Sequence, residues 1–289
     1  MSDNFTMRIV RSICYGAVLL LIINMRFPAA ASGSAKPLKP PSQIAALCFA
    51  YRAMSTHTCG QGIDPRSCTT HEQDLAIIRT DYRVLPNGMA SVWMELLAQP
   101  QATSHIPAPI IRTTIELELL STPEGRLLTT AKRTLSSETW EPEMDMQAAL
   151  AETRLRGLVY RWLILFEQPD IDKAALLAHI RPSTTLNPAT GPSLTGREQI
   201  SNWITAQQQR NKKLQQQVET INIALLAAQR YRLDFAVNWQ ARRTNGALHI
   251  GRKEYHWEVE LGTDGVMHIT HIQQRDALPL PNTGTRIFC

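Results

Sequence analysis

Two segments near the C-terminus alternate apolar and polar side chains, and this pattern limits what the chain can fold into. In the first segment one face carries Tyr231, Leu233, Phe235, Val237 and Trp239. In the second, Tyr255, Trp257, Val259 and Leu261 oppose Glu254, His256, Glu258 and Glu260. A period of two predicts strands that have one face on a core and the other in water. We therefore predict four antiparallel strands between Gln215 and Asp276.

Helical patterns precede these strands. A long helix from about residue 147 ends before Pro169, and a shorter helix capped by Asp170 or Asp172 ends near His179. A loop rich in Pro, Thr and Ser follows. Thr195 and Glu198 have the spacing of a capping box, which predicts a third helix with Ile200, Trp203 and Ile204 directed inward.

The first half of the chain predicts a helix followed by a second set of strands. The helix runs from Ser42 to about Met54, and the strands cover about 74–85, 89–98, 110–121 and 126–135. The tripeptides Pro86-Asn87-Gly88 and Pro123-Glu124-Gly125 join the strands in pairs. Each places Gly at the left-handed position of a three-residue hairpin loop.

These elements predict an α+β protein of two domains. A smaller helix-plus-four-strand domain covers 42–135, an acidic linker 136–146, a larger domain of three helices and a sheet 147–277, and a tail 278–289. Shifting the first half by 140 residues superposes Gly125 on Gly265 and the two sets of strands. A degenerate repeat and two independent four-strand units are both open interpretations.

The N-terminus has the composition of an export signal. Arg8 and Arg11 precede an uncharged run over 12–25, and small residues follow up to Ala31. We expect a signal peptide over 1–31, a flexible Pro-rich lead-in over 32–41, and a periplasmic or secreted protein. An uncleaved anchor is the alternative, although the run is shorter than the roughly 20 residues that a spanning helix needs.

The net charge and the distribution of basic residues argue against a nucleic-acid partner. Removing residues 1–31 takes away three arginines and one aspartate, so the net charge falls from +5 to +3. Basic residues are not interleaved with aromatic ones in a cluster, so we expect no nucleic-acid binding.

Four cysteines remain after the expected cleavage. In an oxidising compartment they predict two disulfides, and we expect Cys59 with Cys68 and Cys48 with Cys289 among three connectivities. A zinc site made of His57, Cys59, Cys68 and His71 is an alternative, but its spacing matches no common zinc module. We therefore expect no metal and no cofactor.

In the second half, three helices precede four long strands, Gly196-Arg-Glu198-Gln-Ile200-Ser-Asn-Trp203 opens the last helix, and His256-Trp257-x-Val259 lies in a later strand. In these features this half resembles the nuclear-transport-factor-2-like, or SnoaL-like, superfamily. The resemblance covers about 150–277. It implies a bent sheet wrapped into a cone against the helices, with a pocket inside. Members include isomerases, dehydratases, hydrolases, binding modules and envelope components, so the resemblance leaves the function open.

The register of the last hairpin predicts one titratable group inside the cone. A three-residue loop at Thr263-Asp264-Gly265 pairs Leu261 with Met267, Val259 with Ile269 and Trp257 with His271. His271 then faces inward, either as a catalytic base or as a core histidine. A bulged loop near Asn245 should align Val237 with Tyr255. No inward pair of carboxylates is predicted, and Asp234 faces outward.

Aromatic side chains on the same inward face are candidates for ligand binding, with core packing as the alternative interpretation. They are Tyr231, Trp239, Tyr255 and Trp257 on the strands and Trp203 on the preceding helix. We therefore expect an exported, non-catalytic protein that binds a small hydrophobic molecule or a protein partner. An isomerase, dehydratase or hydrolase that uses His271 is one alternative, and an envelope secretion or assembly component is another. The outer face of the sheet could hold a second copy in a homodimer.

Overall fold

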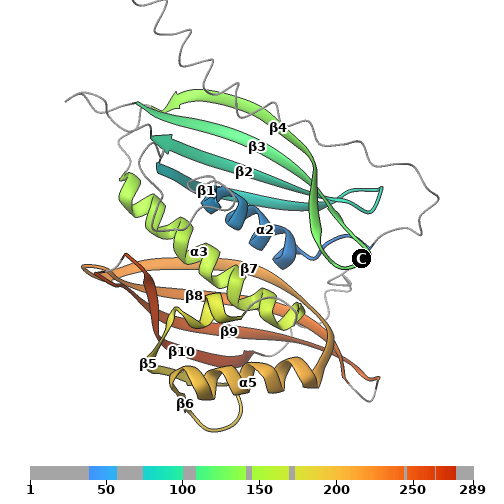
Figure 1. The fold of residues 1–289 in the computed structure, drawn as a ribbon, viewed down its shortest axis with the longest axis vertical. Helices are drawn as coiled ribbons and strands as arrows, with labels where there is room; N and C mark the ends of the chain where they lie inside the picture. Colours follow the sequence, from blue (N-terminus) through green and yellow to red (C-terminus); the bar gives the residue numbers. More distant parts are fainter. Residues whose placement is uncertain are drawn as a thin grey trace, which may run out of the picture. The chain divides into compact units, whose positions relative to one another are not determined.

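The structure is a computed structural model. The residues described are 39–56, 74–99, 109–140, 145–168, 173–243, 246–263 and 265–277. The protein is α+β, as predicted, with two sheets and few helices (Figure 1).

The first sheet is an antiparallel meander in the order β1-β2-β3-β4. Its strands are β1 (Asp74–Val84), β2 (Ala90–Gln99), β3 (Ile110–Ser121) and β4 (Leu127–Trp140). The amide of Leu85 donates to the carbonyl of Met89, and Gly88 and Gly125 both have positive φ, so the three-residue loops are confirmed. Strand β4 continues five residues past its predicted end at 135, into the segment predicted as linker.

The second sheet has the order β6-β5-β10-β9-β8-β7. Its strands are β5 (Ile180–Asn187), β6 (Leu194–Thr195), β7 (Asn211–Ala227), β8 (Arg230–Arg243), β9 (Leu248–Leu261) and β10 (Met267–Ala277). Strands β7 to β10 form the predicted meander. Strand β5 lies where a loop was predicted, and it pairs in parallel with β10. Pro182 hides it in the sequence, but Ile180, Thr184 and Leu186 are fully buried.

Helices fill the space between the sheets and inside the second one. They are α2 (Gln43–Thr56), α3 (Met146–Glu167), the short α4 (Ala174–Leu177) and α5 (Gly196–Arg210). Figure 1 shows α2 and α3 between the two sheets, and both helices contact β1 and β7. One buried cluster includes Val92 of the first sheet, Leu155 of α3 and Trp257 of the second sheet. The division into two domains at 136–146 stays a prediction.

Two strand registers predicted for the second sheet are wrong. They are the register of β10 against β9 after Ile269 and the register of β8 against β9. The pairs Leu261–Met267 and Val259–Ile269 are confirmed, but a β-bulge at Thr270 then shifts the strand by one residue. Consequently Ile272, and not His271, lies opposite Trp257. On the other side of β9, Val237 lies opposite Lys253 and not Tyr255. This second shift of two residues keeps every side chain on its predicted face.

The half-buried carboxyl group of Glu167 joins three elements at the end of α3. The hydroxyl of Ser42 donates to Glu167 Oε2, and the backbone amide of Gln216 donates to Oε1 at 2.6 Å. Ser42 also accepts from the amide of Ala45 and so caps α2. Burial raises the pKa of Glu167 to about 7, although both hydrogen bonds favour the charged form. This carboxyl therefore ties α2, α3 and β7 together.

Glu167 predicts a pH dependence of stability. A carboxyl group whose pKa is raised in the folded state stabilises the fold most when the pH is below its unfolded pKa, near 4.5. This contribution is lost as the pH rises through the folded pKa of about 7. The raised pKa corresponds to roughly 3 kcal/mol of unfolding free energy. From pH 4.5 to pH 8, the melting temperature of the wild type should therefore fall relative to that of Glu167→Gln. A difference that stays constant with pH would contradict this assignment.

Candidate functional site

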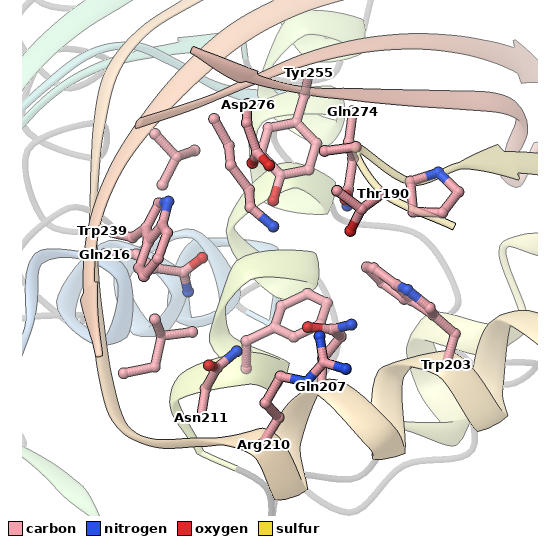
Figure 2. Close-up of a pocket in the computed structure, with 16 residues that line it drawn as sticks. Thr190, Trp203, Gln207, Arg210, Asn211, Gln216, Trp239, Tyr255, Gln274 and Asp276 are labelled. Carbon is pink, nitrogen blue, oxygen red and sulfur yellow. The ribbon is translucent and has the colours of Figure 1, made fainter. Parts of the chain in front are cut away.

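A cavity of about 140 Å³ opens inside the second sheet, between the sheet and the C-terminal ends of α3 and α5. Figure 2 shows its walls. Trp239 and Gln216 lie on one side and Trp203 on the other; Tyr255, Gln274, Asp276 and Thr190 lie above, and Gln207, Arg210 and Asn211 below. Phe166, Leu214, Val237 and Lys253 complete the main lining. Arg210, Thr190 and Asp276 are exposed and mark the mouth, whereas Tyr255, Gln216 and Gln274 are buried. The cavity is therefore aromatic in its walls and polar at several points.

The bulge at Thr270 brings two polar side chains of β10 into this cavity. After the bulge, Gln274 lies opposite Tyr255 and Asp276 lies opposite Lys253. Without the extra residue, Gln273 and Arg275 would take those inward positions, because side chains alternate along a strand. Gln273 instead lies opposite His256 on the outer face. The sequence analysis predicted no inward pair of carboxylates, and the bulge adds one carboxylate, Asp276, to the cavity lining.

Gln274 is the most unusual residue of the cavity. Its side chain is 3% exposed, and neither the amide nitrogen nor the amide oxygen has a hydrogen-bond partner among the described residues. The indole nitrogen of Trp239 is likewise buried without a partner in that part of the chain. A buried polar atom without a partner costs about 1–3 kcal/mol, so such groups in a cavity wall point to a ligand that pairs with them.

Lys253 and Tyr255 share the inward face of β9, and Gln274 lies opposite Tyr255 on β10. Burial lowers the pKa of Lys253, Asp276 opposes this shift, and Arg210 adds to it. The Lys253 side chain makes no ion pair with a described residue. Burial also raises the pKa of Tyr255, so its phenol keeps its proton at neutral pH and can donate a hydrogen bond.

A glycine makes room for one aromatic wall. Gly251 lies opposite Trp239 in the β8–β9 pair, and the indole ring lies across it. A Cβ atom at residue 251 would come within 2.7 Å of the indole ring carbon Cζ2. The absence of a side chain therefore lets the Trp239 ring lie against β9 at the cavity wall.

The structure brings three of the six predicted site residues to the cavity. Trp203, Trp239 and Tyr255 line it. Trp257 is fully buried behind it and packs edge-on against Trp162, with 5.5 Å between ring centroids. Tyr231 is half-buried and does not line the cavity.

His271 does not face the cavity. The bulge places it opposite Glu258 on the other face of the sheet, where its Nδ1 atom lies 2.7 Å from the hydroxyl of Thr185 on β5. The predicted inward position of His271 is therefore wrong, because the register assumed an unbroken strand. The residues that the sequence analysis missed are Lys253, Gln274 and Asp276. The alternation along β9 indicated Lys253, because it lies two residues before Tyr255 and four before Trp257 and therefore shares their inward face.

Other predicted sites fall largely outside the described residues. This applies to Cys59, Cys68, Cys289 and both histidines of the zinc alternative. Cys48 is half-buried on α2, and burial raises the pKa of its thiol to about 11. Within the described ranges, no group of three His, Cys, Asp or Glu residues could hold a metal ion, and no helix has the length and hydropathy to cross a membrane.

No protein-family model matches the chain, and no curated protein matches it. Solved structures do. One is hexachlorocyclohexane dehydrochlorinase LinA-type3 from Novosphingobium barchaimii LL02, at 13% identity over 50% of this chain and 99% of that one, with a TM-score of 0.44. Another is a nuclear transport factor 2-like superfamily protein from Salmonella enterica serovar Typhimurium LT2, at 14% identity over 48% and 99%, with a TM-score of 0.41.

Both structures match about half of this chain, and the second bears the superfamily name that the resemblance in the sequence gave. At these identities and with TM-scores below 0.5, neither their activities nor their ligands are transferred to this chain.

Proposed function

We propose that the protein binds a small molecule with a single planar ring and a polar substituent in the cavity beside Gln274. Size supports this class of ligand. A protein cavity of about 150 Å³ holds one benzene ring, and the cavity here has about 140 Å³. Trp203 and Trp239 stand on opposite sides of it and offer aromatic surfaces to a ring between them.

The single observation that carries the proposal is the unpartnered amide of Gln274. Its nitrogen can donate to a carbonyl or carboxylate oxygen, and its oxygen can accept from an N–H or O–H group. A ligand with both a donor and an acceptor, such as a carboxamide or a protonated acid, would satisfy both atoms at once. The cavity thus supports a more polar ligand than the hydrophobic one expected from the sequence.

A second candidate function is chemistry on the bound molecule. The observation that favours it is the cluster of Lys253, Tyr255 and Asp276 on facing positions of β9 and β10. A lysine with a lowered pKa and a carboxylate are groups that transfer protons, and a neutral phenol stabilises a developing oxyanion. This cluster would replace His271 in the isomerase, dehydratase or hydrolase alternative.

We also propose that the protein acts outside the cytoplasm, in the periplasm or as a secreted protein. The support is the basic, then uncharged, then small-residue pattern over 1–31. The intact mass of the protein isolated from its host should lack residues 1–31, and a full-length mass would contradict cleavage.

Gln274→Met tests the binding function. The substitution keeps the length of the side chain and removes both polar atoms, so it should weaken binding of benzamide roughly tenfold or more. It should also raise the melting temperature, because the buried amide without partners is gone. Benzamide binding is measured by ligand-observed NMR and by the fluorescence of the cavity tryptophans.

Gln273→Met is the matched control, since Gln273 precedes Gln274 on the outer face of the same strand. It should leave benzamide binding unchanged. If Gln274→Met lowers the melting temperature and binds benzamide as the wild type does, Gln274 is a structural residue and the proposed function fails.

A further inference from the structure

Lys253 is placed for covalent chemistry. It lines the cavity, makes no ion pair with any residue in the described part of the chain, and lies two residues from Tyr255 on the same face of β9. On one face of a strand such neighbours are about 7 Å apart along the chain. An amine and a phenol at this spacing can both reach one functional group of a bound molecule.

A second neighbour lies across the strands. Asp276 is directly opposite Lys253 in the antiparallel β9–β10 pair, where Cβ atoms are about 4.5–5.5 Å apart. Asp276 is exposed at the mouth, so its carboxylate can exchange protons with water while it remains close to the amine. The three groups therefore offer a nucleophile, a hydrogen-bond donor and a proton carrier around one space.

We propose that Lys253 forms an imine with an aldehyde or ketone group of the molecule that the cavity binds. This inference rests on the proposed function, because a ring held between Trp203 and Trp239 is what brings a carbonyl substituent to Lys253. It goes further by naming the class of ligand, a small aromatic carbonyl compound.

The lone pair of Lys253 Nζ attacks the carbonyl carbon, and the π electrons move to the oxygen, to which Tyr255 donates a hydrogen bond. A proton then passes from the nitrogen to the oxygen, with Asp276 as the carrier, to give a neutral carbinolamine. The hydroxyl group then accepts a second proton, carried by Asp276, and leaves as water while the nitrogen lone pair forms the C=N bond. The nitrogen of this iminium releases its remaining proton to Asp276, which leaves the neutral imine. The net change is one carbonyl and one amine to one imine and one water.

The state of the amine supports this assignment. Only the unprotonated amine is a nucleophile, and burial lowers the pKa of Lys253, so more of it is unprotonated at neutral pH than for an exposed lysine. Lys132 on β4 is a useful contrast. Desolvation lowers its pKa as well, but its side chain is exposed and lies on the first sheet, away from the cavity.

Reductive trapping tests the proposal on the full-length protein. Benzaldehyde is added with sodium cyanoborohydride, which reduces an imine to a stable benzylamine, and peptide mapping locates the benzyl groups. We expect benzylation of Lys253 ahead of Lys132, loss of that label in Lys253→Arg and in Lys253→Met, and protection of Lys253 by excess benzamide. The melting temperatures of both variants confirm that they are folded.

The outcomes separate this inference from the proposed function. If benzamide binds but Lys253 is labelled no faster than Lys132, the imine proposal is overturned while the binding function stands. If benzamide does not bind and Lys253 is not labelled, both fail. Labelling of Lys253 that benzamide does not reduce would show a reactive lysine outside the ligand site, which also overturns the proposal.

Discussion

The single extra residue at Thr270 determines what the cavity of this protein contains. Side chains alternate strictly along a strand, so one inserted residue exchanges the two faces for everything that follows. Before the bulge, β10 contributes Ile269 to the core; after it, the strand contributes Gln274 and Asp276 to the cavity. The hydroxyl of Thr270 donates to the carbonyl of Glu258 at 3.1 Å, which fixes the bulge against β9. The chemistry proposed for the cavity depends on this local irregularity.

The wall of the cavity at Gln216 depends on a second constraint, the carboxyl group of Glu167. Gln216 donates its backbone amide to Glu167 and its side-chain amide to the carbonyl of Leu163, so it is held from both ends while it lines the cavity. The same carboxyl accepts from Ser42 at the start of α2. This wall of the cavity, in the second sheet, is thus held by α3, which also packs against β1 of the first sheet.

The sequence predicted much of this fold because most of its elements follow simple periodicities. The glycines at 88, 125 and 265 each adopt positive φ in the predicted hairpin loops. The faces of β8 and β9 are as the alternation indicated, with Leu233, Phe235 and Trp257 buried. Strand β5 was missed because Pro182 and three hydroxyl residues resemble a loop, and its parallel pairing to β10 is a long-range contact that no local pattern encodes.

The site was predicted only in part, and the reason is the same bulge. Trp203, Trp239 and Tyr255 were found through apolar periodicity, whereas Gln274 and Asp276 follow an insertion that leaves no mark in the sequence. The most direct test of the account is therefore the register of β9 against β10 in solution, read from cross-strand backbone NOEs. We expect contacts between Tyr255 and Gln274 and between Lys253 and Asp276. Contacts between Tyr255 and Gln273 and between Lys253 and Arg275 would contradict the account, because they would place neither Gln274 nor Asp276 in the cavity.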